Sequence, residues 1–152
     1  MKRFSGTDFA NIESVLSEEE RMVRDSVREW VEEQVVPVAP ARLLDTRHGI
    51  GARQGVVGGA GEIDLGVTGV GGVDPAASAV ILNVTATGAS EETFVTVYPD
   101  GVGRPDASSL NVASGGTIAN LVIAKVGANG RVRLYNDAGG VHLLADVTGY
   151  FI

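Results

Sequence analysis

The pattern of apolar positions divides the chain into two parts that meet near residues 37–40. Before this point, apolar residues recur at steps of three and four, which is typical of one face of an α-helix. After it, short apolar or alternating runs are separated by glycine-rich turns, which is typical of β-strands. We therefore expect an N-terminal helical segment, residues 1–37, followed by a β-domain, residues 38–152.

The first part predicts one amphipathic helix over about residues 18–35. Ser17 and Glu20 have the spacing of a capping box, and Pro37 cannot continue a helix because it lacks the backbone N–H. The apolar residues expected to form the packing face of this helix are Val23, Val27, Trp30, Val31 and Val35. Such a face packs either on the β-domain or on a second copy, so self-association through the helix is one expectation.

The second part predicts eight strands, and no helical stripe lies between them. Their expected ranges are 41–45, 62–68, 78–87, 93–98, 108–112, 118–126, 131–135 and 141–151. Short strands with turn signals between them favour an all-β fold, either an antiparallel, jelly-roll-like β-sandwich or a small barrel. Residues 80–101 and 121–140 also resemble each other, which we interpret either as two similar hairpins or as an accidental likeness of valine-rich segments.

Composition and charge narrow the classes of function. The chain carries 12 basic and 19 acidic residues, a net charge of −7, and neither part forms a basic patch. We therefore expect neither nucleic-acid binding nor attachment to an anionic membrane, because both depend on clustered lysine and arginine. The absence of cysteine excludes disulfides and thiolate metal sites. The N-terminus lacks an apolar signal region, so the chain as written is expected to stay in the cytoplasm.

Catalytic and metal chemistry have few candidates in this sequence. It holds two histidines, His48 and His142, but no nucleophile elbow and no histidine cluster, so we expect no enzyme activity, no metal and no cofactor. Asp100 and Asp106 could offer carboxylates to calcium. Turn chemistry explains both aspartates better, because they lie among the proline and glycine residues of PDGVGRPD.

Two groups of residues are candidates for ligand binding. Arg42, Asp45 and Arg47 form a charged cluster that either pins the first strand through ion pairs or grips a sugar or carboxylate. On an ideal strand Asp45 shares a face with Arg47, whereas Arg42 points to the other side. Tyr98 and Tyr135 occupy matching places in the two similar segments and are candidates either for core packing or for stacking on sugar rings.

Several strings of the β-domain occur in a characteristic order. They include VAPARLLDTR at 38–47, VTGVGGVDPAASAVILNVTAT at 67–87 and HLLADVTGYF at 142–151. Over nearly all of 38–151 the chain resembles a β-domain common in secreted and surface proteins of actinobacteria. The resemblance implies a non-enzymatic surface or structural module, with a cell-wall polysaccharide as its partner. The missing leader and Asp74, where a bulkier residue is commoner, depart from the family pattern.

The helical segment contains the string LSEEERMVRDSVREWVEEQVVP at 16–37. This string, with the residues around it over roughly 1–38, resembles the first helix of acyl-CoA dehydrogenases, especially the glutaryl-CoA type. The flavin site, acyl-CoA pocket and catalytic glutamate of that family lie in downstream segments that this chain does not contain, so no FAD and no catalytic residue carry over. The two resemblances meet at VPVA, residues 36–39, which favours a chimera as the alternative interpretation, whether recombined, engineered or generated by a sequence model.

Overall fold

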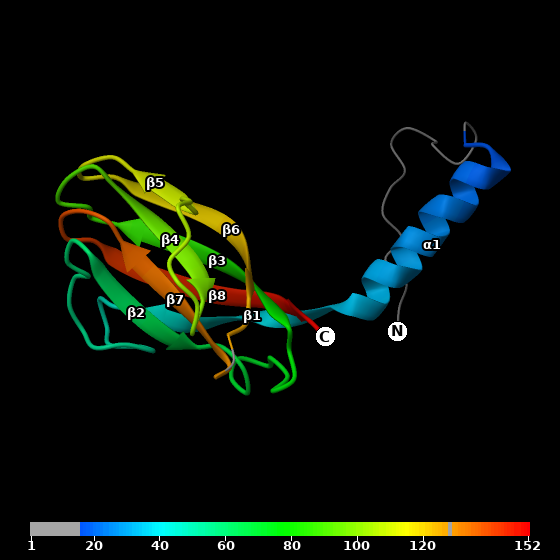
Figure 1. Ribbon diagram of the computed structural model, residues 1–152, viewed down its shortest axis with the longest axis horizontal. Coiled ribbons are helices and arrows are strands. Elements are labelled where there is room, and N and C mark those ends of the chain that lie inside the picture. The colour runs from blue at the N-terminus through cyan, green and yellow to red at the C-terminus, as the bar shows by residue number, and fades with distance from the viewer. Residues whose placement is uncertain (1–15, 128) are drawn as a thin grey trace. The chain divides into compact units, whose positions relative to one another are not determined.

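The chain divides into two compact units, Met1–Gln34 and Val35–Ile152, in the computed structural model (Figure 1). The structure describes residues 16–127 and 129–152. Residues 1–15 of the predicted helical segment, which belong to the dehydrogenase-like region, lie outside the described residues. In the described part of the chain, no helix is long and apolar enough to cross a membrane.

The described part of the first unit contains one α-helix, α1 (Glu18–Gln34). The predicted capping box closes its N-terminus. The Glu20 amide donates to Ser17 Oγ at 3.2 Å, and the Ser17 amide donates to Glu20 Oε2 at 2.8 Å. Hydrogen bonding of the Glu20 carboxylate to the Ser17 backbone, and second to the Ser17 side chain, lowers the pKa of Glu20. The sequence therefore identifies both the start of the helix and the contacts that stabilise it.

The predicted packing face of the helix needs one correction. Val23, Val27, Trp30 and Val31 belong to α1, and all four are exposed on the helix taken by itself. Val35 does not belong to the helix, because it is the first residue of β1 (Val35–Asp45). Two β-branched valines precede Pro37, and both the branching and the following proline favour extended geometry. The helix accordingly ends at Gln34 rather than at 35.

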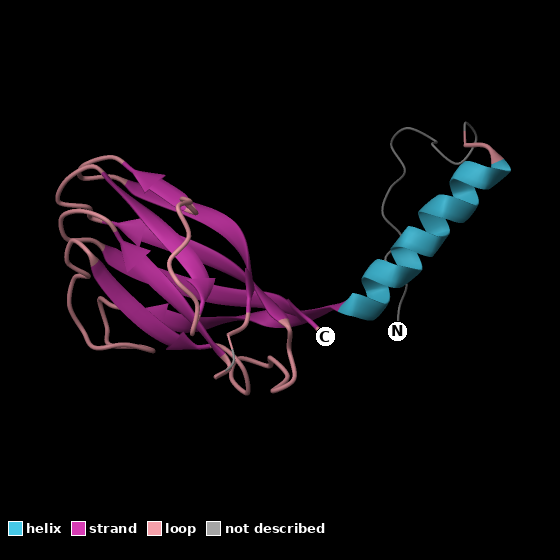
Figure 2. Cartoon of the chain, in the orientation of Figure 1, coloured by secondary structure: helices cyan, strands magenta, loops and turns pink. Residues whose placement is uncertain are grey.

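The second unit is an antiparallel sandwich of two four-stranded sheets, whose strands are magenta in Figure 2. One sheet has the order β1-β8-β3-β6 and the other the order β2-β7-β4-β5. After β1, the strands are β2 (Gly61–Gly66), β3 (Ala79–Thr87), β4 (Thr93–Pro99), β5 (Leu110–Val112), β6 (Thr117–Lys125), β7 (Arg131–Asn136) and β8 (His142–Phe151). This arrangement confirms the predicted all-β fold. β1 begins before the predicted residue 41 and contains two prolines, which an edge strand tolerates.

The strands pair as in one long two-stranded antiparallel ribbon that is rolled on itself. β1 pairs with β8, β2 with β7, β3 with β6 and β4 with β5. Rolling this ribbon adds the pairs β3–β8 and β4–β7. Eight strands in two such sheets form a jelly roll, and the sandwich does not close into a barrel. The interpretation of 80–101 and 121–140 as hairpins is wrong, because β3 and β4, and likewise β6 and β7, lie in different sheets.

The hydrophobic core lies between the inner faces of the two sheets. In β3 the buried residues alternate with half-buried ones, so Val80, Leu82 and Val84 point inward. Val132 and Leu134 of β7 are fully buried in the same core from the opposite sheet. Each such side chain contributes roughly 1.5–3 kcal/mol of burial free energy. The same alternation decides which side chains point outward, and it thereby places the candidate site.

Candidate functional site

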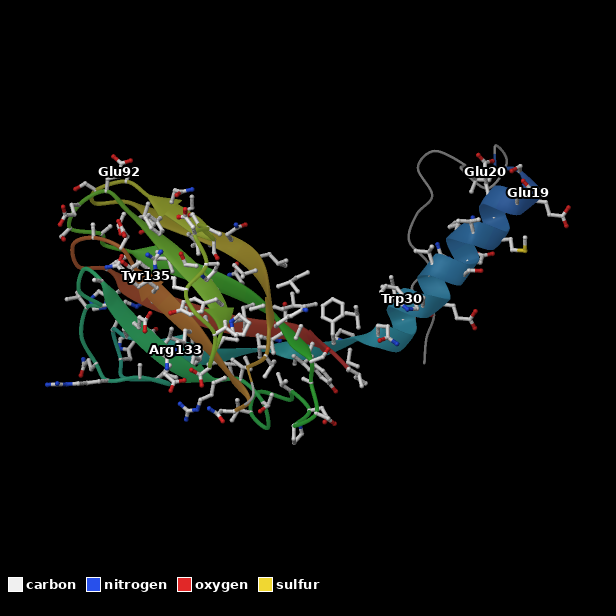
Figure 3. All side chains as sticks on the ribbon, viewed as in Figure 1. Glu19, Glu20, Trp30, Glu92, Arg133 and Tyr135 are labelled. Atoms are coloured by element: carbon white, nitrogen blue, oxygen red, sulfur yellow. The ribbon has the colours of Figure 1, made fainter. Side chains whose placement is uncertain are left out.

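The candidate site lies on the outer face of the β2-β7-β4-β5 sheet, where Figure 3 labels Arg133 and Tyr135 of β7. Because Val132 and Leu134 face the core, Arg133 and Tyr135 face outward. The strand register brings two rows of outward side chains together, Glu62–Tyr135–Thr96 and Asp64–Arg133–Tyr98. The face thus gathers residues from three strands that are distant in the sequence.

Arg133 is the centre of an ion-pair network on this face. Its Nη1 lies 3.0 Å from Glu62 Oε2, and its Nε lies 2.6 Å from Asp100 Oδ1. Asn129 Nδ2 donates to the second oxygen of Asp100 at 3.1 Å. Hydrogen bonds from Arg133 and then from Asn129 lower the pKa of Asp100. Both carboxylates therefore act as ionised acceptors that are held in place by the guanidinium.

Tyr98 is a buried structural residue and not an exposed platform for a ligand. Its side chain is only 3% exposed, and its hydroxyl donates to Glu62 Oε1. Burial, followed by this hydrogen bond, raises the pKa of Tyr98 to about 12, and the same hydrogen bond is the main cause of the lowered pKa of Glu62. Of the two interpretations of Tyr98, the structure supports packing, because the ring is covered and its polar end has a partner.

Tyr135, the second predicted tyrosine, is half-buried at the surface of the same face. The guanidinium carbon of Arg104 lies 4.3 Å from the centre of its ring, a cation–π contact. Phe94 lies beside it, with the ring centres 6.3 Å apart, and the Tyr135 hydroxyl donates to Asp137 Oδ1 at 3.2 Å. The two predicted tyrosines therefore share one sheet face, but only Tyr135 reaches the surface.

A hollow of about 500 Å³ adjoins the β2 edge of this face. The loop 51–58 supplies one part of its lining, including Arg53 and Gln54, and Gly61–Asp64 of β2 supplies another. Its volume lies within the range of roughly 300–1,000 Å³ that is usual for small-ligand sites. Glu62 lines the hollow and also belongs to the Arg133 network, so it links the hollow to the outer face.

The Arg42, Asp45 and Arg47 cluster forms, but not in the geometry of an ideal strand. The pairing of β1 with β8 shifts between Arg42 and Leu44, and this β-bulge turns Arg42 to the side of Asp45. Asp45 Oδ2 lies 2.9 Å from Arg42 Nη1 and 2.8 Å from Arg47 Nη2. Arg42 also pairs with Asp146 of β8. The geometry supports the first interpretation of this cluster, in which ion pairs pin the first strand.

We expect acid to destabilise the β-domain partly through Asp45. The hydrogen bonds from the Arg47 side chain hold the pKa of Asp45 far below its usual range, whereas an unfolded aspartate titrates near about 3.9. A carboxylate with a depressed folded-state pKa stabilises the fold fully above its unfolded pKa, and this contribution is lost as the pH falls toward the folded pKa. Urea unfolding midpoints should therefore decrease below about pH 4.

The matched variant for this experiment is Asp45→Asn, which keeps the size of the side chain. This variant should have a lower urea unfolding midpoint than the wild type at neutral pH. Below about pH 4 its midpoint should decrease less steeply than that of the wild type, because the titrating carboxyl group is absent. An acid decrease as steep as that of the wild type would contradict the role assigned to Asp45.

The predicted calcium candidates do not form a site with each other. Asp100 is buried, and both of its oxygens have partners in Arg133 and Asn129. Asp106 lies exposed in the connection between β4 and β5. Within residues 16–127 and 129–152, no group of three or more acidic, histidine or cysteine side chains is arranged to hold a metal ion. Asp100 is better described as an ion-pair partner of Arg133.

Sequence reasoning missed Glu62, Arg104 and Arg133 as members of this site. Alternation in the segments EIDLG and RVRLY could have placed Glu62 and Arg133 on outward faces. It could not have shown that they face each other, because this requires the register of β2 against β7. Arg104 carries no pattern signal, since it reaches Tyr135 from an irregular connection between strands.

Comparisons with known proteins do not change this assignment. No family model matches the chain, and no curated protein matches it either. The resemblances to an actinobacterial surface domain and to acyl-CoA dehydrogenases therefore stay predictions from the sequence, and the function has to be inferred from the geometry of the site.

Proposed function

We propose that the β-domain is a non-enzymatic surface module that binds a hydroxyl-rich polymer, such as a cell-wall polysaccharide. The proposed binding surface is the outer face of the β2-β7-β4-β5 sheet together with the hollow beside β2. The observation that carries the proposal is the juxtaposition of Tyr135 with Glu62, which are direct partners in the strand register, because Glu62 also lines the hollow.

The charges of this face suit a neutral, hydroxyl-rich ligand. It carries acidic and basic side chains side by side, and they include Glu62, Asp64, Asp100, Asp137, Arg104, Arg131 and Arg133. Carboxylates accept hydrogen bonds and guanidinium groups donate them, so sugar hydroxyls could pair with both. A polyanion such as a nucleic acid would instead require an excess of positive charge. Tyr135 adds an apolar ring surface with a polar end.

The electrostatics of the site favour binding over catalysis. Acid catalysis by a carboxyl group needs a pKa raised toward the working pH. Glu62 and Asp100 have lowered pKa values instead, because Tyr98, Arg133 and Asn129 donate to their charged forms. Such carboxylates are poor proton donors at neutral pH, and Glu62, which lines the hollow, is suited to act as a fixed acceptor for ligand hydroxyls.

Co-sedimentation of the purified chain with insoluble actinobacterial cell-wall material tests this proposal. The wild type should sediment with the wall in a saturable way, and Tyr135→Ala and Arg104→Ala should each weaken binding about tenfold, which corresponds to roughly 1.4 kcal/mol. Phe151→Ala is the matched control, because Phe151 is an aromatic residue of β8, which belongs to the other sheet, and this variant should bind like the wild type.

The variant Tyr98→Phe distinguishes the structural role of Tyr98 from the proposed binding role of Tyr135. It removes only the buried hydroxyl that donates to Glu62, so it should reduce stability more than it reduces binding. If the wild type does not sediment with the wall, or if Phe151→Ala lowers binding as much as Tyr135→Ala does, the proposed binding face is wrong.

A second candidate is a chimera without a native ligand, in which the fold itself is the purpose. It is supported by the boundary between the two compact units at Gln34 and Val35, which lies close to the point where the two sequence resemblances meet. The discovery of an intact natural gene that encodes both parts would contradict it. Absence of binding to every wall fraction would favour it over the binding module.

A further inference from the structure

The edges of the two sheets differ in how well they are protected from pairing with another chain. Proteins usually protect edge strands with proline, bulges, charges or short length. β1 contains Pro37 and Pro40 and has two register shifts, and β5 has only three residues. β2 has six residues and carries outward charges at Glu62 and Asp64. Three of the four sheet edges therefore have a recognisable protection.

β6 is the fourth edge, and the only one of these features that it has is a single charge at one end. It is nine residues long, contains no proline and pairs with β3 without a register shift. Its only charged residue is Lys125, at the C-terminal end of the strand. Leu121 and Ile123 are 60% and 58% exposed, although both are large apolar residues. A long, regular and apolar edge of this kind is a template for pairing with another strand.

The backbone of β6 shows which groups point to the open edge. In an antiparallel pair, directly opposed residues alternate between hydrogen-bonded and non-hydrogen-bonded pairs. Val126 N donates to Ser78 O at 2.9 Å and Gly88 N to Gly116 O at 3.1 Å, so the even-numbered residues of this segment bond to β3. The odd-numbered residues direct their N–H and C=O groups outward, and within the described chain these groups have no backbone partner. These residues are Thr117, Ala119, Leu121, Ile123 and Lys125.

We propose that β6 pairs antiparallel with β6 of a second copy, about a two-fold axis at Leu121. Leu121 is the central residue of Thr117–Lys125, and its own N–H and C=O point outward, so it can form a hydrogen-bonded pair with its counterpart. The β1-β8-β3-β6 sheets of the two copies then join into one continuous sheet across the dimer. Because each of the five outward residues in each copy donates one bond, the pairing forms about ten hydrogen bonds, as in a typical protein interface.

The strand is its own complement in this register, which is why a second copy fits it. Antiparallel pairing about Leu121 places Ala119 opposite Ile123 and Thr117 opposite Lys125. The apolar side chains on the outer face then meet each other, and the two lysines lie at opposite ends of the interface, where they do not repel. An isologous dimer requires this self-complementarity of one surface patch. The proposal does not depend on the ligand of the other sheet.

The test is the solution mass of the full chain over a range of concentrations, measured by light scattering or sedimentation. The wild type should approach twice the 15.7 kDa mass of one chain. Leu121→Lys and Leu121→Glu should each remain at the mass of one chain, because they place like charges directly opposite each other. Mixing these two variants should restore the dimer, since lysine then faces glutamate. Ile50→Lys, which changes an exposed apolar residue outside the strands, should dimerise like the wild type.

Ala119→Pro provides a second variant in case a charge at 121 disturbs folding. The Ala119 N–H points to the open edge, so proline removes no hydrogen bond to β3, but it blocks pairing between copies. Circular dichroism should show a folded monomer. A wild type of single-chain mass at all concentrations would overturn the proposal, and so would a Leu121→Lys dimer. A dimer that is lost in Val27→Ser/Trp30→Ser and kept in Leu121→Lys would assign association to the helix and also overturn it.

Discussion

Replacing Asn136 with alanine should destabilise the β-domain by about 3 kcal/mol, because each buried polar group left without a partner costs roughly 1–3 kcal/mol. Asn136 is fully buried, and its Nδ2 lies within 3.0–3.1 Å of four backbone carbonyl oxygens. Those carbonyls belong to two connections, 57–58 and 138–139. Its Oδ1 also accepts from Thr93 Oγ1 at 2.8 Å. Asn136 therefore ties the end of β7 to both connections.

Asn136→Asp is the informative comparison, because it keeps the size of the side chain and replaces the donating amide group with a carboxyl group. An ionised carboxylate would face carbonyl oxygens, so the pKa of the introduced group should be raised above its unfolded value of about 3.9. A raised folded-state pKa gives stability that is present below the unfolded pKa and is lost as the pH rises. Urea unfolding should show a larger deficit relative to the wild type at pH 7 than near about pH 4. A pH-independent deficit would contradict the donor role of Asn136.

The second large effect is expected for Gly51→Ala, which should destabilise the fold by about 2–4 kcal/mol through a backbone clash added to strain at positive φ. Gly51 has φ +68°, and a methyl group there would lie 2.0 Å from the carbonyl oxygen of Leu43. Leu43 is the bulged residue of β1, so the loop that contains Gly51 must approach the bulge closely. Gly51 also lines the hollow beside β2, so the variant should deform that hollow.

Gly69→Ala is the matched control for this effect. Gly69 has a similar φ of +71°, but nothing lies within 4 Å of a methyl group built there. Gly69→Ala should therefore lower the free energy of unfolding only through the strain at positive φ, by about 1–2 kcal/mol. The difference between the two unfolding free energies isolates the contact with Leu43. Equal losses in the two variants would show that the close approach has no energetic consequence.

The existence of the strands could be predicted, because each has a local pattern. TFVTVY alternates and becomes β4, and the valine-rich segment around 80–86 becomes the buried strand β3. Pairing partners carry no such local signal, which is why the likeness of 80–101 and 121–140 suggested hairpins. In the fold, these two segments instead pair with each other, β3 with β6 and β4 with β7.

The surroundings of the residues predicted for ligand binding could be inferred from the sequence only in part, for two physical reasons. The first is the bulge at Leu43, which reverses the alternation and brings Arg42 to Asp45. The second is the segment 101–109, which folds over the outer sheet face, where Ala107 O accepts from Thr96 Oγ1 at 2.6 Å and Arg104 lies over Tyr135. Neither feature has a period in the sequence, so exposure of Tyr135 and burial of Tyr98 could not be distinguished.

Amide chemical-shift mapping tests the proposed ligand face most directly. The ¹⁵N-labelled chain would be titrated with soluble oligosaccharide fragments of actinobacterial cell wall. We predict saturable shift changes that cluster on β2, β7, the loop 51–58 and Arg104, with little change on β3 and β6 of the other sheet. Unchanged spectra at saturating fragment, or changes that cluster on the β1-β8-β3-β6 sheet, would contradict the assignment of the β2-β7-β4-β5 face as the binding surface.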